Sequence, residues 1–478
     1  MSRGAAVRGA AVLNGPGFRV YCAAMPTPTS LGLCLAALLC LPCRGSDAPP
    51  LPATTAAGLR GFAADAQREL RGNILPFWLN NARDREHGGF HSFIGEDMKV
   101  RDDLPHGLVL TSRILWTFSA AYRAYRDPQY LEMARWAYRD LMDRFVDKEN
   151  GGFLWAVRAD GKPAGPPGGG PGAGRKIMYG EAFAIYGLSE YYRATGDIAA
   201  LQQAIAVYGL IERNDHDAVN GGYFDVLDRQ WKRVGEEPKG APFAGAPKSQ
   251  NSHIHILEAF ANLLRVWPDD GLRGRERELV ELTLGKIIDT RTHHLVLFMK
   301  DDWTPVGDGV SYGHDIELSW LLVEAAEVVG DPALVARARQ EAIAIAKVTA
   351  AQGVDTDGAV YHDGGPKGAT DMTKEWWEQA EGTVGFLNAY QISADPAFLA
   401  DSQRSWRFIQ DKLVDRVHGD WYDTLTRDGT PIVDIPGWDG TTEPAAKLSM
   451  WKCPYHNSRA CMQVIERVGE LLGGAPGG

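Results

Sequence analysis

The sequence predicts an all-α protein, a single (α/α)6 barrel of about twelve helices, with long aromatic loops and short β-hairpins at one end. Two observations predict it. Two kinds of turn alternate along the chain, and the segments between them alternate between amphipathic and almost wholly apolar. An α-solenoid would contain similar helices. The regular return of long aromatic loops favours a closed ring, because those loops can then converge on one mouth.

The first kind of turn joins glycine to an aromatic residue. It reads GGF or GGY at 88–90, 151–153 and 221–223, recurs in looser form at 358–361 and 419–421, and one member of the series is missing. The second kind ends in aspartate, often followed by proline, at 126–128, 196–197, 269–271, 330–332 and 394–396. Glycine suits a helix C-terminus, aspartate an N-cap and proline the first helical turn, so each of these breaks should separate two helices.

The segments between the turns differ in how much of their surface is apolar. Residues 114–125 and 130–142 carry apolar side chains at a period of 3.6, as in helices with one buried face. In contrast, 182–192, 254–264, 317–329 and 383–390 are apolar almost all round. Helices of that kind are buried, and we interpret them as the inner layer of the barrel.

The composition limits the class of partner. The chain has 478 residues, with 61 Asp plus Glu against 50 Lys plus Arg and a formal net charge of −11. This acidic balance argues against nucleic acid or an anionic membrane surface as the partner, and a neutral small molecule fits better. Cys453 and Cys461 are the cysteines of the chain's body, and on one helix they would lie too far apart for a disulfide.

The N-terminus resembles a secretory leader. Arg3, Arg8 and Arg19 precede an apolar run over 31–41 that is too short to span a bilayer but is typical of a signal peptide. We therefore expect a leader over 1–45, a linker rich in Pro and Ala over 46–57, and the barrel over 58–473. Export would place the mature chain in the periplasm or outside the cell; a misassigned start would leave it cytoplasmic.

Three histidine-bearing segments carry most of the chemical information: NSHIH at 251–255, GHDIE at 313–317 and WKCPYHN at 451–457. Like Arg113, Tyr179 and the double tryptophan at 376–377, they fall at or near the start of an expected inner helix. A closed ring would bring them to one cavity. Histidine can take and give a proton at neutral pH, so two imidazoles on opposite sides of one carbon could invert its configuration.

Neighbouring side chains suggest how these groups are supported. His314 and Glu317 are three apart on one helix, so the carboxylate could fix the imidazole tautomer. Trp376, Trp377 and Trp451 offer planar faces for sugar rings, and at least one of the two adjacent tryptophans should leave the packing face. His253 and His255 stand two apart on a helix and should diverge, and the sequence has no HExxH, so we expect no metal site.

The runs NSHIHILEA, GHDIELSWLL, WWEQAE and WKCPYHNSRAC make the chain, from about 58 to 472, similar to the N-acylglucosamine 2-epimerase superfamily and within it to the cellobiose (or mannobiose) 2-epimerases. The resemblance implies a monomeric barrel without catalytic metal, nicotinamide or other cofactor. It implies reversible epimerisation at C2 of the reducing-end glucose or mannose of β-1,4-linked disaccharides (cellobiose, mannobiose or lactose) through a cis-enediolate.

Roles follow from the same resemblance. His314 and His456 would be the acid/base pair. His255 and Arg113 would stabilise the enediolate, and Glu317 would support the histidines. The substrate would be held by a set of polar and aromatic side chains: Asn251, Tyr179, Trp376, Trp377, Trp451 and Glu381.

Other activities remain open on the sequence alone. An aldose-ketose isomerase would reprotonate the same enediolate at C1, and an N-acylglucosamine 2-epimerase would use a different sugar. An inverting glycoside hydrolase would need two carboxylates about 6.5 to 9.5 Å apart, for which Asp315, Glu378 and Glu381 are candidates. A carbohydrate-binding module without turnover would need only the aromatic residues.

Overall fold

The computed structural model describes residues 51–165, 174–234, 245–436 and 442–473. The expected leader at 1–45 lies outside these ranges. The chain divides into two units, 1–50 and Leu51–Gly478, and the second contains the barrel. Helix α1 begins at Ala53, so 53–57 is helical and the expected linker is wrong over those residues. The alanine-rich sequence after Pro52 favours helix, which explains the difference.

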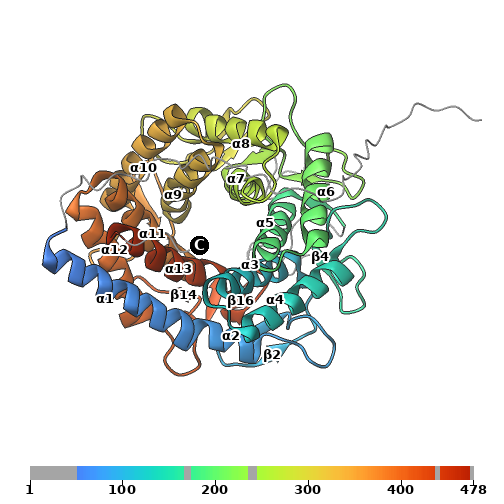
Figure 1. The fold of residues 1–478 in the computed structure, drawn as a ribbon, viewed down its shortest axis with the longest axis horizontal. Coiled ribbons are helices and arrows are strands. Elements are labelled where there is room, and N and C mark those ends of the chain that lie inside the picture. The colour runs from blue at the N-terminus through green and yellow to red at the C-terminus, as the bar shows by residue number, and fades with distance from the viewer. Residues whose placement is uncertain (1–50, 166–173, 235–244, 437–441, 474–478) are drawn as a thin grey trace, which may run out of the picture. The chain divides into compact units, whose positions relative to one another are not determined.

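Six inner helices form a closed ring (Figure 1). Each packs against the next in chain order, and the last packs against the first. They are α3 (Leu108–Tyr125), α5 (Met178–Thr195), α7 (Gln250–Leu264), α9 (Tyr312–Val329), α11 (Trp376–Ser393) and α13 (Tyr455–Leu471). This closure confirms the (α/α)6 barrel and excludes the solenoid.

A second layer of helices surrounds the ring, and its longer members pack against one or two inner helices. It consists of α1 (Ala53–Glu69) with α2 (Leu75–Asn81), α4 (Pro128–Asp140), α6 (Ile198–Asn214), α8 (Asp270–Leu282), α10 (Pro332–Gln352) and α12 (Pro396–Phe408). Four π-helical turns lie at their C-terminal ends: η1 (Leu70–Ile74), η2 (Leu141–Phe145), η3 (Thr283–Ile287) and η4 (Ile409–Leu413). No helix of the described ranges is long and apolar enough to cross a bilayer.

The expected aspartate N-caps are present on five outer helices. Each aspartate accepts a hydrogen bond from a backbone N–H two or three residues further on, at Asp127, Asp197, Asp269, Asp331 and Asp395. Four inner helices end just before them in a left-handed residue: Arg126, Gly196, Gly330 and Ala394. The second kind of turn therefore ends an inner helix and begins an outer one, as its sequence predicts.

Short antiparallel strands anchor the starts of inner helices to the loops. The pairs are β3 (His106–Gly107) with β4 (Ala156–Val157), β5 (Lys176–Ile177) with β6 (Val226–Leu227), and β13 (Lys374–Glu375) with β14 (Thr424–Leu425). Three-stranded sheets comprise β7 (Lys248–Ser249), β8 (Phe298–Met299) and β9 (Pro305–Val306); β10 (Val310–Ser311), β11 (Asp363–Gly365) and β12 (Gly368–Asp371); and β17 (Ala446–Leu448), β1 (Phe93–Gly95) and β2 (Val100–Arg101). β15 (Asp434–Pro436) pairs with β16 (Thr442–Pro444).

The missing member of the glycine-aromatic series lies at 289–294. The N–H of Asp289 donates to the carbonyl of His294 (2.9 Å), as Asp217 does to Gly222 (2.8 Å). His293 has a left-handed φ of 61°, where Gly221 has 77°. The turn was invisible in the sequence because a non-glycine residue takes the conformation that normally selects glycine.

The fourth residue of four inner helices fixes one of these turns. Its side chain accepts a hydrogen bond from the first N–H after the turn: Glu181 from Phe153, His253 from Tyr223, Asp315 from Leu295 and Gln379 from Val360. Buried lysines add a second link to four turn aspartates: Lys176 with Asp147, Lys248 with Asp217, Lys374 with Asp355 and Lys447 with Asp415. These contacts hold the helix starts, and with them the motifs, at one end of the ring.

Candidate active site

The predicted site residues lie at or near the starts of the six inner helices. Tyr179 is the second residue of α5, His314 the third of α9 and His456 the second of α13. Asn251 and His255 belong to the first two turns of α7, Trp376 and Trp377 open α11, and Arg113 is in the second turn of α3. Successive ring contacts link all of them, so the barrel brings the motifs together as expected.

His456 is buried and its orientation is fixed. Its Nδ1 lies 2.7 Å from Oε1 of Glu381 and 3.8 Å from Oε1 of Glu317. Burial, together with the charges of Arg113 and Arg459, holds the pKa of His456 well below its usual range. The imidazole is therefore neutral at pH 7. With Nδ1–H donated to a carboxylate, Nε2 carries the lone pair and is the basic atom.

His314 is oriented by Ser311, the N-cap residue of α9. Its Nδ1 lies 2.9 Å from the Ser311 hydroxyl oxygen. Burial, followed by the nearby His255 and His362, lowers the pKa of His314 to about 3. Glu317, considered as a partner of His314, instead lies 3.8 Å from Nδ1 of His456 and accepts from Arg459. The Glu317 carboxylate turns to Arg459 because a guanidinium offers a charged hydrogen bond that a neutral imidazole does not.

Arg459 joins three carboxylates beneath the histidines and was missed in the sequence. Its Nη2 donates to Oε1 of Glu317 (2.5 Å) and Oε1 of Glu381 (2.7 Å), and its Nη1 donates to Oε2 of Glu258 (2.6 Å). Burial and the adjacent Glu381 raise the pKa of Glu317 to about 8. The available signal was spacing, since Arg459 stands three residues after His456 on one helix.

Glu381 was expected to contact substrate, and in the structure its carboxylate contacts protein groups. Its Oε1 accepts from Arg459 and lies against His456, while its Oε2 accepts from Nε1 of Trp320 (2.9 Å). The side chain is 1% exposed. Glu381 therefore orients His456, and both of its carboxylate oxygens accept hydrogen bonds from the protein.

His255 and Arg113 form the neighbouring part of the site. Nδ1 of His255 lies 2.7 Å from Oε1 of Glu258, and its ring packs edge-on to Tyr179 at a centroid distance of 4.7 Å. Arg113 donates from Nη2 to the Tyr179 hydroxyl (2.6 Å), and its guanidinium carbon lies 4.2 Å from the ring centroid of Phe183. A buried positive charge thus stands beside a buried imidazole.

Aromatic side chains complete the site. Trp451 is 39% exposed and packs against Tyr179 (5.9 Å between centroids) and against Trp155 (5.8 Å), which sequence reasoning missed. Trp377 is half-buried and contacts both His314 and His456. Trp376, expected to bind substrate, is only 4% exposed and packs against His456 instead. One of the two adjacent tryptophans therefore leaves the packing face, as expected.

Two polar side chains near the site differ in whether their hydrogen-bonding atoms have partners in the protein. Asn251 is half-buried, and its Oδ1 has no hydrogen-bond partner among the described residues. His253 is committed to the fold: its Nδ1 lies 2.7 Å from the Ser249 carbonyl, and its Nε2 accepts from the N–H of Tyr223 (3.1 Å). The two histidines of the HIH run thus diverge, as their spacing predicts.

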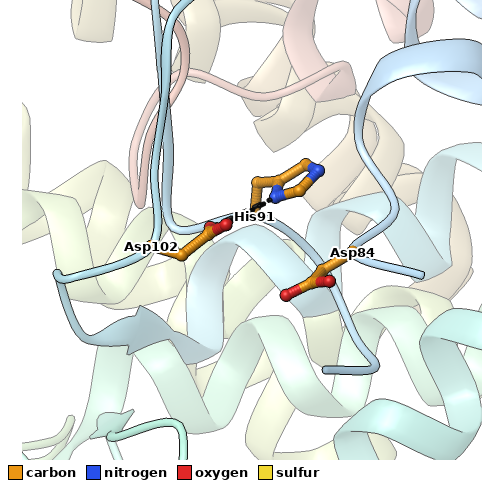
Figure 2. A group of neighbouring side chains, drawn as sticks. All are labelled: Asp84, His91 and Asp102. Atoms are coloured by element: carbon orange, nitrogen blue, oxygen red, sulfur yellow. Dashed lines mark hydrogen bonds and ion pairs between the residues drawn. The ribbon is translucent and has the colours of Figure 1, made fainter. Parts of the chain in front are cut away.

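Three groups within the described ranges have the residue types of a metal site. The first group comprises Glu317, Glu381 and His456. Arg459 binds both of these glutamates and already supplies the positive charge that a metal ion would bring. The second comprises His362, Glu375 and Glu378, and the third Asp84, His91 and Asp102. Figure 2 shows the third group, where Nδ1 of His91 lies 3.0 Å from Oδ2 of Asp102. Asp84 accepts from the N–H groups of its own turn. The donors of these groups are therefore engaged with protein partners.

The carboxylates considered for a hydrolase are also engaged. Asp315 lies 2.6 Å from Nδ1 of His294, and Glu378 lies 2.6 Å from Nδ1 of His362. Oε1 of Glu317 and Oε1 of Glu381 bind one nitrogen of Arg459.

The structure is an (α/α)6 barrel with buried histidines gathered at the starts of its inner helices. The model of the N-acylglucosamine 2-epimerase (GlcNAc 2-epimerase) family matches residues 88–443, and the chain belongs to this family. A cellobiose 2-epimerase of Bacteroides fragilis is 39% identical over 402 residues, which cover 84% of this chain and 98% of that protein. One of Dictyoglomus turgidum is 36% identical and is covered completely, over 86% of this chain.

Solved structures support the same family assignment. The cellobiose 2-epimerase from Spirochaeta thermophila has a TM-score of 0.77 at 36% identity, covering 88% of this chain and 100% of that one. A D-mannose isomerase has a TM-score of 0.68 at 20% identity, covering 87% of this chain and 99% of that one, and shares the fold alone.

Proposed function

We propose that this protein inverts the configuration at C2 of the reducing-end glucose or mannose of β-1,4-linked disaccharides, with cellobiose as a substrate. The observation that carries the proposal is the pair of neutral imidazoles, His314 and His456, packed against the same indole ring of Trp377 at centroid distances of 4.7 and 5.7 Å. The names of the similar proteins support the reaction and the sugar class.

The proton transfers follow from this arrangement. One histidine takes the C2 proton of the open-chain sugar on its Nε2, and the electron pair of the C–H bond moves into the enediolate. The other histidine, after taking a proton from solvent on its own Nε2, gives that proton to the opposite face of C2, and the first imidazolium then returns its proton to solvent. Low pKa values keep both rings neutral between turnovers, and they make either imidazolium a strong proton donor once it forms.

The enediolate gains negative charge on oxygen as it forms. Arg113 provides a positive charge in a buried setting, and His255, held by Glu258, provides a second polar group beside it. Preorganised groups of this kind stabilise developing charge more effectively than water does. Asn251 and Tyr179 would hold the hydroxyls of the reacting sugar, Trp377 its ring, and the exposed Trp451 the non-reducing ring.

The decisive experiment is incubation with cellobiose in D₂O, with EDTA present, followed by NMR of the products. Formation of glucosyl-mannose with deuterium at C2 is expected. Free glucose would identify a hydrolase, a glucosyl-fructose product alone an aldose-ketose isomerase, and binding without any product a binding module. Turnover of N-acetylglucosamine in preference to the disaccharide would move the assignment to the other branch of the family.

Single histidine variants test the two-base chemistry. We expect His314→Ala and His456→Ala each to lower epimerisation by about 10²- to 10⁴-fold, the usual contribution of general acid–base catalysis, while leaving sugar affinity nearly unchanged. Each variant keeps one base, so it should still exchange the C2 hydrogen of one epimer with D₂O. Exchange of both epimers at equal rates in either variant would contradict the assignment.

We further propose that the protein acts as an exported monomer. The ring closes within one chain, and one chain supplies every site residue, which supports the monomer. The basic and apolar N-terminal sequence supports export. Light scattering after size exclusion tests the first point; retention of residues before Ser46 in protein isolated from its native host would exclude the second.

A further inference from the structure

Trp377 is the side chain that touches both proposed acid/base residues. Its ring centroid lies 4.7 Å from that of His314, on α9, and 5.7 Å from that of His456, on α13. Trp377 itself belongs to α11, so three separate helices meet at this ring. A small shift of the indole would therefore change the space between the two imidazoles.

The glycine before His314 leaves room for the indole. A Cβ atom placed on Gly313 would lie 2.5 Å from Cη2 and 2.8 Å from Cζ3 of Trp377, and 2.7 Å from Cγ of Glu378. Real Cβ atoms do not approach heavy atoms so closely, so any side chain at 313 would displace the ring. Gly313 lies in the first turn of α9 with an ordinary helical backbone, so the missing Cβ, rather than backbone freedom, is what this position requires.

Glu375 fixes the other edge of the indole. Its Oε2 accepts a hydrogen bond from Nε1 of Trp377 (2.6 Å). Glu375 is the N-cap of α11, where its own N–H donates to Oε2 of Glu378 (3.0 Å) in a capping box. His362 lies 3.7 Å from Oε1 of Glu375 and 2.6 Å from Oε1 of Glu378. The acceptor for the indole N–H is thus held by a backbone cap and by an imidazole.

We propose that Gly313 and Glu375 are positioning residues that form a seat for Trp377 and thereby set the geometry of proton transfer between His314, C2 of the sugar and His456. The inference rests on the proposed function. Neither residue needs to touch the reacting atoms. Gly313 allows the ring to lie against α9, and Glu375 fixes the direction of its N–H, so the sugar is held in line with both imidazoles.

The size of the effect follows from the distances. An added Cβ would need the ring to move by about 1 Å to reach ordinary van der Waals contact, and a misplacement of that size can cost about 10²-fold in rate. We therefore expect Gly313→Ala to lower kcat by about 10- to 100-fold with a smaller change in KM. Glu375→Ala should act in the same direction, and Glu375→Gln should restore most of the loss, because its amide oxygen still accepts from the indole.

A double-variant cycle separates positioning from general damage. Trp377→Phe removes Cη2 and Cζ3, the indole atoms that a Cβ at position 313 would meet. If Gly313 acts through the ring, Gly313→Ala should cost much less in the Trp377→Phe background than in the wild type, with the remaining loss coming from Cγ of Glu378, 2.7 Å from the added Cβ. If the two losses multiply, the seat is refuted. Gly469→Ala is the matched control, since a Cβ at that helical position meets no atom within 4 Å; it should keep wild-type kcat.

A second readout does not depend on turnover. In protein labelled with 5-fluorotryptophan, the ¹⁹F resonance missing in Trp377→Phe belongs to Trp377. We expect that resonance to shift in Gly313→Ala and to stay in place in Gly469→Ala, with thermal unfolding checking that each variant is folded. An unmoved resonance would overturn the proposal. If the wild type turns over no disaccharide, the proposed function fails, and the resonance still decides whether Gly313 sets the position of the ring.

Discussion

Arg459 is the residue on which the charge balance of the site depends. It is 2% exposed, and three glutamates, on α7, α9 and α11, bind it from different sides. Through Glu258 it reaches His255, and through Glu381 it reaches His456. One guanidinium therefore stabilises the partners of two site histidines, which is a reason for arginine here, because its fork of donors suits several carboxylates at once.

Replacing this arginine should destabilise the protein in a pH-dependent way. Arg459→Gln leaves three buried carboxylates without a counter-charge, and breaking a buried pair on one side typically costs about 3 to 5 kcal/mol. The pKa values of Glu317 and Glu381, which burial already raises, would then rise further, and the pKa of Glu258 would lose the lowering effect of the Arg459 charge. The loss should consequently be small near pH 4.5, where the groups are protonated, and should grow as the pH rises to 8.

Urea unfolding of wild type and variant at pH 5 and pH 8 measures this difference. The matched control is Arg339→Gln, which breaks an exposed ion pair with Glu327 and should change the stability by less than about 1 kcal/mol at either pH. Equal losses for Arg459→Gln at both pH values would show that the glutamates are not the cause.

At the residue scale, sequence reasoning found the histidines but not their partners. Histidine types and helix starts identified His255, His314 and His456, because residue chemistry and helix position are local properties. The partners Glu258, Arg459 and Ser311 could not be ranked in the same way. Arg459 binds glutamates 78 to 201 positions away, which spacing cannot find. Glu258 and Ser311 are each three residues from their histidine, but the same spacing also made Glu317 the apparent partner of His314, although its carboxylate binds Arg459.

At the element scale, the repeating unit is a turn tied to the fourth residue of the next inner helix. Glu181, Asp315 and Gln379 make this contact with side-chain oxygens, and His253 makes it with Nε2. His253 therefore belongs to the repeat, whereas His255, two residues later, belongs to the site. A comparison of repeats could have separated them, but only with the turn at 289–294 in register, and His293 in place of glycine concealed that turn.

The contact between His253 and the Tyr223 N–H should make the stability of the protein depend on pH. Burial lowers the pKa of His253 to about 4, from 6.5 in the unfolded chain. The folded state thus favours the neutral imidazole. The contribution of this group to the free energy of unfolding is fully present above pH 6.5 and is lost as the pH falls towards 4. Between pH 8 and pH 5 the loss is about 2 kcal/mol.

His253→Gln should remove that dependence without breaking the contact, because Gln379 makes the same hydrogen bond to Val360 at 2.7 Å. We expect the stability of the variant relative to wild type to improve by about 2 kcal/mol between pH 8 and pH 5, measured by denaturant unfolding. His253→Leu is the companion variant: it cannot accept the Tyr223 N–H and should be destabilised at both pH values. A constant difference between His253→Gln and wild type would refute the assignment.

At the scale of the whole molecule, the ring and its two layers were predictable, because apolar periodicity records how much of each helix is buried. The contacts that close the ring were harder to predict from the sequence. Helix α13 packs against α3 and α11 within the inner ring, and α1, from the other end of the described chain, covers it from outside. The catalytic candidate His456 and Arg459, which binds three glutamates, both lie on α13, so the position of the site depends on this closure.

Two truncations test that dependence. Removing residues 1–50 should leave the melting temperature and the turnover unchanged, since it keeps Leu59, Phe62 and Ala66 of α1, each at most 5% exposed. Removing 1–70 deletes this helix and exposes the apolar face of α13, so the cooperative unfolding transition and the epimerase activity should be lost together. Leu59→Ala is the milder form, with an expected cost of about 2 to 5 kcal/mol for a fully buried leucine. A 1–70 deletion that still melts cooperatively and still epimerises would mean that α13 holds its histidine without the outer layer, and that the inner ring alone defines the site.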